Sequence, residues 1–351
     1  MNVLITILSV IVVLSFLVFI HEGGHYLAAR SFGVRVTEFM IGLPGPRIGF
    51  MKNGTKFGVT AVPLGGYARI CGMEPGPESP YLEQALAYSY AMGSVTAEDF
   101  ATHASISSKE AEEALDQLVF WGSLDGVSAR KKDTIYKTPI QKKGQVAGSQ
   151  RPVDDAHEFY LSEKSQQYRT IAPWKRCIIV LAGPLVNIVF ALLAFVVIYS
   201  CVGVDMLNPN TGVVEHVMVS PLKALTASFV YLGMVIQAVA QLFNPATAAD
   251  TISQSTSIVG IAVLSKSALD QGFINFVLFT AMISVSLGIM NLLPILPLDG
   301  GRFVIELYQK ITRRTVSEKA MEYLSLAGIA FVLLLFIIML NQDVQHFIFG
   351  N

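Results

Sequence analysis

The stretch FLVFIHEGGHYLAAR, residues 16–30, decides the fold, because an apolar run suited to a lipid bilayer leads directly into three ionisable residues. These residues are His21, Glu22 and His25, with two glycines between the glutamate and the second histidine. Three ionisable groups at the end of a membrane span cost a few kcal/mol together unless a partner compensates them. A bound metal ion would offset that cost and would explain the trio.

The spacing of the three residues fits a zinc site on a helix. His21 and His25 are four positions apart and share one helix face, so both imidazoles can ligate one ion. Glu22 is offset around the helix and can reach a water molecule beside the metal. This is the His-Glu-x-x-His pattern of zinc peptidases, in which the glutamate is the general base. The alternative is that these histidines only pack inside the protein. This interpretation would be preferred for a single isolated histidine, but it does not explain three ionisable residues together.

The two glycines inside the pattern, Gly23 and Gly24, need a reason of their own. Each costs up to about 1 kcal/mol relative to alanine in a helix interior. That cost is tolerable where another backbone, a substrate or a neighbouring span approaches closely. We therefore expect a close neighbour at this turn of the first span.

Composition places the chain in a membrane. Of its 351 residues 52% are hydrophobic and only 15% are charged, against roughly a quarter in soluble proteins. The net charge of −1 gives no general affinity for nucleic acid. Four apolar segments approach or exceed the ~20 residues that cross a bilayer: Val3–Ile20, Cys177–Val204, Phe273–Leu293 and Tyr323–Leu340. The predicted fold is therefore a membrane α-helical one with four transmembrane helices.

Charge bias sets the predicted orientation. Basic residues are concentrated in residues 31–176 and 302–319, whereas residues 205–272 contain few. The positive-inside rule then places residues 31–176 in the cytoplasm and 205–272 outside. A fifth apolar stretch, 222–243, is expected to be an amphipathic brace helix at the outer surface, because a fifth span would move 302–319 outside.

The predicted order of segments runs from the first transmembrane helix to the fourth. We expect a first span with the histidine pattern (1–30), a β-loop region (31–75), a soluble α/β domain (80–137), a linker (138–170), a second span (171–204), an external loop (205–272), a third span (273–301), a cytoplasmic segment (302–322) and a fourth span (323–345).

A β-hairpin is predicted on the cytoplasmic side, close to the histidine pattern. Residues 50–62 contain two extended runs around Asn53-Gly54, a pair that suits the positive φ angles of a tight hairpin turn. Extended residues 34–39 and 67–70 flank it. We expect a small membrane-associated sheet here.

The soluble insertion is predicted to resemble a winged helix-turn-helix. Helices are expected at 81–92, 97–103 and 108–121, the last two with capping-type residues at their starts. Strands are expected at 129–132 and 134–137, with residues 131–133 at the tip of the wing. The helix that would enter a DNA groove is acidic, so nucleic acid is an improbable partner and a cytoplasmic protein partner is expected instead.

A catalytic zinc site usually has three protein ligands, and Asp299 is the candidate for the third. It follows Pro294 and Pro297, which stop regular helix, and precedes Gly300-Gly301, which permit a tight turn before a helix near Arg302. The alternative role for Asp299 is an N-cap of that helix.

At this point the motifs resemble the site-2 protease family of intramembrane zinc metalloproteases (M50 type). The resemblance rests on HEGGH (21–25), VPLGGYARICG (62–72), AGPLVN (182–187) and NLLPILPLDG (291–300), in this order. It implies one Zn²⁺ per chain, held by His21, His25 and Asp299, with Glu22 as the catalytic base. It also implies that Asn291 lies near the site and holds substrate backbone.

Further roles follow from the same resemblance. The hairpin, with Gly54, Phe57 and Gly58, would pair with an unwound substrate strand. Structural positions of the motifs would be Gly183, Pro184, Asn187, Pro294, Pro297 and Gly300. Many relatives carry a PDZ domain after the second span; residues 205–221 are too few for one, so this chain is expected to be a variant without it.

The predicted function is zinc-dependent cleavage of transmembrane segments in single-span membrane proteins, in the lipid bilayer of a bacterial inner or plasma membrane. An anti-sigma factor, a transcription regulator or a signal-peptide remnant would suit as substrate. The alternative is a non-hydrolytic membrane adaptor with a structural metal. A metal transporter is a third reading, but the second and fourth spans have almost no polar residues.

Overall fold

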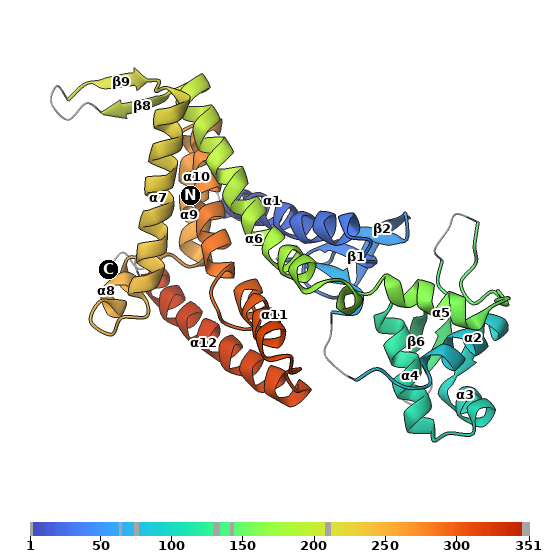
Figure 1. Cartoon of the computed structure of the whole chain (residues 1–351). Helices are drawn as coiled ribbons and strands as arrows, with labels where there is room; N and C mark the ends of the chain where they lie inside the picture. Colours follow the sequence, from blue (N-terminus) through green and yellow to red (C-terminus); the bar gives the residue numbers. More distant parts are fainter. Residues whose placement is uncertain are drawn as a thin grey trace.

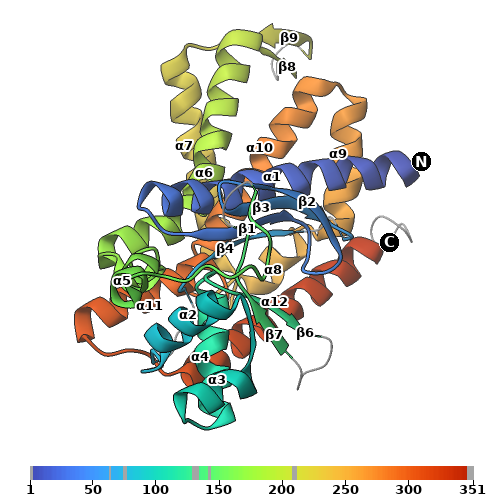
Figure 2. The same ribbon diagram turned by 90° about the vertical axis from the view of Figure 1, so that its right-hand side faces the viewer.

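The computed structural model describes residues 3–62, 65–73, 77–128, 134–140, 144–207 and 212–345. It has three parts that are visible in Figure 1: a group of long helices, a four-stranded sheet against one of them, and a small domain beyond the sheet. The chain passes from the first helix through the sheet into the small domain and then returns to the long helices (Figure 2).

Five described helices are long and apolar enough to cross a membrane: α1 (Val3–Ser31), α6 (Pro173–Val197), α7 (Pro221–Gln241), α10 (Phe273–Asn291) and α12 (Glu318–Val344). Many of their large apolar side chains face outward; Leu193 on α6, for example, is 61% exposed. Such a surface suits a lipid environment and makes the chain a multi-pass membrane protein.

Helix α6 is the central element, with α1 and α10 packed against it. Its contact with α10 is a buried cluster that includes Ala191, Phe195, Ala281 and Val285. Gly288 of α10 brings the helices close, since a Cβ there would lie 3.0 Å from the carbonyl oxygen of Pro184. Small residues at the interface permit this approach in a membrane, where packing drives helix association.

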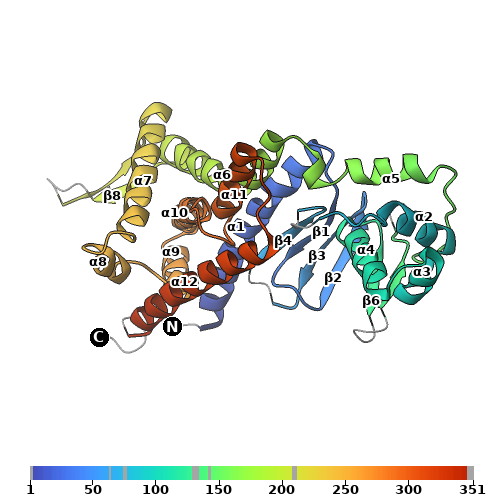
Figure 3. The same ribbon diagram turned by 60° about the horizontal axis from the view of Figure 1, so that its bottom comes forward.

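Helix α7 has the length and composition of a span, although residues 222–243 are predicted to be a brace at the outer surface. It starts beside the far end of α6, where Val219 N donates to the carbonyl of Tyr199. It ends near Phe243, whose ring stacks on Phe331 of α12 with 6.1 Å between centroids. Helices α8 (Ala248–Ser253) and α9 (Ile258–Asp270) then lead back to α10 (Figure 3).

The predicted hairpin and its flanking strands are present. Strands β1 (Val36–Ile41), β2 (Arg47–Lys52), β3 (Thr55–Thr60) and β4 (Gly66–Ile70) form one sheet in the order β2-β3-β1-β4. The turn between β2 and β3 has positive φ at both Asn53 and Gly54, as predicted. Strand β1 is parallel to β3 and antiparallel to β4, so β4 is an edge strand.

The insertion contains three helices and a three-stranded sheet: α2 (Leu82–Met92), β5 (Ser94–Thr96), α3 (Ala97–Ala104), α4 (Ser108–Phe120), β6 (Asp125–Ser128) and β7 (Thr134–Lys137). The predicted capping residues act at α3 and α4, where Thr96 and Ser107 form capping boxes. Asp125 and Gly126 begin β6, although their types suit a turn. The predicted strand 129–132 and wing tip 131–133 lie outside the described residues.

The predicted linker, residues 138–170, contains regular structure. Helix α5 (Ala156–Ser165) and a 3₁₀ turn at Tyr168–Thr170 precede α6. Phe159 and Tyr160 pack on the core of the insertion, so α5 belongs to that domain. The prediction of an unstructured linker is wrong for α5, because only a few apolar residues indicate this helix in an otherwise polar segment.

A helix also occupies most of the predicted cytoplasmic segment 302–322, since α11 spans Asp299–Thr312. Its Glu306 pairs with Arg176 near the start of α6 at 3.1 Å. At the other end of α6, strands β8 (Val204–Leu207) and β9 (Val214–Val217) form a short hairpin that leads into α7.

Candidate active site

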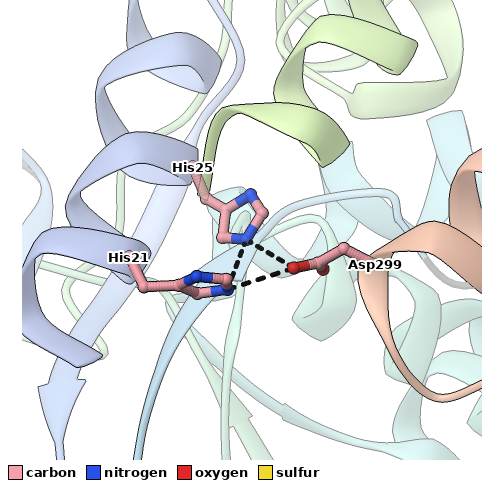
Figure 4. Close-up of side chains that lie close together, drawn as sticks. All are labelled: His21, His25 and Asp299. Carbon is pink, nitrogen blue, oxygen red and sulfur yellow. Dashed lines mark hydrogen bonds and ion pairs between the residues drawn. The ribbon is translucent and has the colours of Figure 1, made fainter. Parts of the chain in front are cut away.

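Three predicted ligands, separated by up to 278 positions in the chain, meet at one point (Figure 4). Asp299 Oδ2 lies 3.0 Å from His21 Nε2 and 3.3 Å from His25 Nε2. The two Nε2 atoms are 3.3 Å apart. Both histidines are buried and Asp299 is partly buried, so the cluster is shielded by protein.

These distances suit a tetrahedral metal ion. Ligand atoms held at 2.0–2.1 Å around a tetrahedral zinc are about 3.3 Å apart. Two imidazole nitrogens and one carboxylate oxygen are also a donor set that catalytic zinc uses, with the fourth position left for water or substrate. The ligand atoms of these three residues all lie within 4.8 Å of one another.

The helix α6 fixes the orientation of His25. The Nδ1–H of His25 donates to the carbonyl oxygen of Ile179 at 2.7 Å, which leaves Nε2 available to ligate a metal. Pro184, in the next turn of α6, cannot donate a backbone hydrogen bond and loosens the helix here. Gly183 provides the space for the imidazole, because a Cβ at this position would lie 2.3 Å from His25 Nε2.

Asn187 of α6 supports His21 in the same way. It is fully buried, and its Nδ2 lies 3.3 Å from His21 Nδ1, while its Oδ1 has no partner in the described structure. When Nε2 binds metal, Nδ1 carries the proton and needs an acceptor. Exchanging the nitrogen and oxygen of the Asn187 amide provides that acceptor and satisfies Oδ1. The orphaned oxygen therefore fits a metal-ligating histidine.

The close neighbour expected at the two glycines is α6. A Cβ on Gly24 would lie 2.5 Å from the carbonyl oxygen of Ala182, so glycine is required there. Gly23 has a different position, since a Cβ on it would meet no described atom within 4 Å. The hypothesis is confirmed for Gly24 alone.

The loop between α10 and α11 presents Asp299. Regular helix stops at Asn291, and the segment with Pro294 and Pro297 turns the chain back. Helix α11 begins at Asp299 itself, with Leu298 as its N-cap, so the predicted start near Arg302 is too late. Gly300 lies inside the first turn, where a Cβ would be 2.2 Å from the carbonyl oxygen of Leu292.

Glu22 lies next to His21 on α1, with its carboxylate against the sheet. Its Oε2 accepts a hydrogen bond from the backbone N–H of Ala68 at 2.9 Å. Ala68 is in the edge strand β4, and this N–H points away from the neighbouring strand β1. The predicted base is thus held between the cluster of His21, His25 and Asp299 and the edge strand β4.

The predicted substrate-binding residues make other contacts in the described structure. Asn291 ends α10 and its Nδ2 donates to the carbonyl of Leu287. Phe57 belongs to an aromatic group with Phe39, Phe50 and Tyr26. Gly54 is in the hairpin turn, and Gly58 is paired within the sheet to Gly49 and Met40.

Two functional groups could not be predicted from side-chain patterns, the carbonyl of Ile179 and the N–H of Ala68. Both are backbone groups, which every residue has, so no residue type signals them.

Comparisons with known proteins agree with this geometry. The model of peptidase family M50 matches residues 9–335. A Campylobacter jejuni protein assigned as a zinc metalloprotease is 27% identical, over 98% of this chain and 94% of its own length. The zinc metalloprotease RasP of Shouchella clausii is 25% identical, over 97% and 99%. A Rickettsia conorii protein assigned as a zinc metalloprotease is 26% identical, over 98% and 99%. The chain is therefore a metalloprotease that belongs to peptidase family M50.

Proposed function

We propose that this protein is a zinc-dependent intramembrane endopeptidase that cleaves transmembrane segments of single-span membrane proteins. One observation carries the proposal: His21, His25 and Asp299 lie within 4.8 Å of one another at the end of an apolar helix, with Glu22 adjacent. One zinc ion fits these three ligands. When bound there, zinc supplies Lewis-acid chemistry, polarising the scissile carbonyl and making water more acidic.

The residues of the chain perform the proton transfers and the positioning. Glu22 takes a proton from the attacking water and passes it to the leaving amine as the peptide bond breaks. The hydrogen bond from Ala68 N–H fixes the carboxylate in the half-buried position beside His21. Ile179 and Asn187 hold the two imidazoles so that their Nε2 atoms face Asp299.

An extended substrate is required, because a helical peptide bond is shielded by its own hydrogen bonds. Strand β4 is the edge strand closest to Glu22, which supports substrate pairing along it. Asn291 at the end of α10 stays a proposed substrate contact, and so do Gly54, Phe57 and Gly58 of the hairpin, although not by strand pairing at Phe57 and Gly58, because β3 is already paired on both sides. In this arrangement the hairpin supports the sheet from its opposite edge.

The proposed topology keeps four full spans, α1, α6, α10 and α12, in a bacterial inner or plasma membrane. Helix α7 leads away from the outer end of α6, and α9 returns to the start of α10. Since a segment that enters and leaves the bilayer on one side does not change the orientation of later spans, residues 31–176 and 302–319 stay cytoplasmic.

The insertion is proposed to be a winged-helix domain that binds protein. The order helix, strand, helix, helix, strand, strand and the sheet order β5-β7-β6 support this assignment. Helix α4 has Glu110, Glu112, Glu113 and Asp116 against Lys109, which opposes phosphate binding.

The natural substrate is proposed to be an anti-sigma factor, another membrane-bound regulator or a signal-peptide remnant. A PDZ domain is not expected between α6 and α10.

The competing function is a membrane adaptor with a structural metal. It leaves unexplained why an ionisable Glu22 is held beside the cluster, since a structural site needs no base. The test is Glu22→Gln in the full chain in lipid, with a model transmembrane substrate. We expect cleavage to fall by at least about 10³-fold while zinc content stays near one per chain. Full cleavage by the variant, or none by the wild type, would contradict the proposal.

A further inference from the structure

A cavity lies between the insertion and the start of α6, outside the metal site. Its volume is about 770 Å³. Helix α4 and residues 77–81 form one wall, while Gly72, Gln167 and Arg169 come from the membrane-proximal side. We call it the cytoplasmic groove. It is large enough for several side chains of an extended peptide.

The groove is acidic. Four carboxylates line it, those of Glu78, Glu110, Glu113 and Asp116, against the guanidinium of Arg169; of the four, Glu78 is paired with Lys164. The three carboxylates on α4 are exposed, and Phe120 and Trp121 provide apolar surface beside them. Carboxylates next to aromatic faces suit lysine and arginine side chains, which combine a cationic group with an apolar stem.

A second observation at the groove also indicates a hydrogen-bond donor as ligand. Gln167 lines the cavity and is 2% exposed. Its Nε2 donates to the carbonyls of Glu163 and Trp121, but its Oε1 has no partner in the described structure. A buried carbonyl oxygen without a donor is costly. This oxygen lies toward Gly72, since a Cβ on that glycine would be 3.0 Å from it.

A smaller cavity of about 250 Å³ lies between the groove and the elements that carry the catalytic residues. Arg169 lines both cavities, and the smaller one reaches Ala68 of β4 and Pro297 of the loop before Asp299. Gly72, at the edge of the groove, is only four residues after Ala68. An extended chain covers that separation in about 13 Å.

We propose that the cytoplasmic groove binds the basic juxtamembrane segment of the substrate and thereby selects it. This inference rests on the proposed function and adds the substrate class to it. Single-span proteins carry lysines and arginines next to their span on the cytoplasmic side, whichever way they are oriented. A substrate strand on β4 continues past Gly72 into the groove, where its basic residues meet the carboxylates of α4.

The test is Glu113→Lys in the full chain, with Glu112→Lys as matched control. Both residues are exposed on α4, but only Glu113 lines the groove. The only ion pair of Glu113 in the described structure is with Lys109 at 3.8 Å, which is exposed and contributes little to stability. Two model substrates with the same transmembrane segment are compared, one with four lysines after it and one with four glutamines.

We expect the wild type and Glu112→Lys to prefer the lysine substrate by the same factor in kcat/KM. Glu113→Lys should lower this preference by roughly fivefold. Binding of the fluorescent lysine peptide to each variant, made in the Glu22→Gln background, should weaken by a similar factor. An unchanged preference and affinity in Glu113→Lys would overturn the groove assignment and leave the protease intact. An equal loss of the preference in both lysine variants would show that the net charge of the insertion, and not the groove, causes the effect, and would also overturn the assignment. Absence of cleavage in every variant would contradict the proposed protease activity itself.

Discussion

The insertion and the membrane part bury their apolar residues in opposite ways. The insertion encloses a core of its own, in which Phe100, Leu115 and Leu118 are fully buried. In the membrane part, large apolar residues such as Leu193 and Val230 face outward. The insertion is thus built to fold in water, whereas the membrane part depends on lipid. The two parts therefore have different roles. The candidate metal site is formed where membrane helices meet, whereas the insertion provides a surface for binding.

One buried ion pair joins the two parts. The guanidinium of Arg35, just before β1, donates to both oxygens of Glu163 on α5 at 2.6 and 2.7 Å. Both side chains are almost fully buried, and Ser123 also donates to Glu163. The contact therefore positions the insertion against the sheet that holds Glu22.

The largest effect is expected where two membrane helices meet at the metal site. In Gly183→Ala, the new Cβ would overlap His25 Nε2, and this imidazole is also fixed by Ile179 on the same helix. We expect kcat/KM to fall by at least about 100-fold, with weaker zinc binding. Cleavage assays and zinc content measure this. The control is Gly233→Ala on α7, where a Cβ meets no described atom within 4 Å; equal activity of the two variants would refute the role of Gly183.

An intermediate effect is expected at the ion pair between Arg35 and Glu163. Glu163→Gln leaves the buried charge of Arg35 without its counterion, which costs about 3–5 kcal/mol. The insertion should then separate from the sheet more often. Cys71 reports this, because its thiol is fully buried beside Gly122 and burial raises the pKa of Cys71 to about 11. We expect its alkylation at pH 8 to accelerate by at least about tenfold.

The matched control for Glu163→Gln is Glu158→Gln, the same substitution at an exposed position of α5. Mass spectrometry of the peptide that contains Cys71 separates its reaction from those of Cys177 and Cys201. If Cys71 reacts at the wild-type rate in Glu163→Gln, the ion pair does not hold the two parts together.

The smallest expected effect comes from comparing an exposed residue on a membrane helix with an exposed residue on the insertion. Val230 on α7 is 59% exposed and Leu161 on α5 is 49% exposed. If α7 lies in the bilayer, Val230→Lys costs about 2–3 kcal/mol, whereas Leu161→Lys changes stability by at most about 0.5 kcal/mol. Thermal unfolding in lipid nanodiscs compares the two variants. Equal stability would place α7 in water and return it to the role of an outer brace.

Much of the site could be predicted from the sequence, because its chemistry is local. The pair His21 and His25 needs only one helix face, and Asp299 follows prolines that stop a span at the same depth. The hairpin turn at Asn53 and Gly54 is equally local, since both residues tolerate positive φ.

Features that depend on distant contacts could not be predicted. The order of the strands, with β4 rather than the hairpin beside Glu22, requires knowing how the chain crosses the sheet. Helix α5 looks like linker until its Phe159 and Tyr160 meet the core of the insertion. Charge counting also cannot detect the proposed path of α7 and α9, because a segment that enters and leaves the bilayer on one side does not change the orientation of later spans.

The distance between the ligands along the chain has a consequence for biosynthesis. His21 leaves the ribosome 278 residues before Asp299. At 5–20 residues per second this interval is roughly 15 to 55 s. During that time the two histidines are inserted without their carboxylate, so the nascent chain has no complete metal site. With Asp299 as the proposed third ligand, the metal site is therefore completed only after the third span has been made.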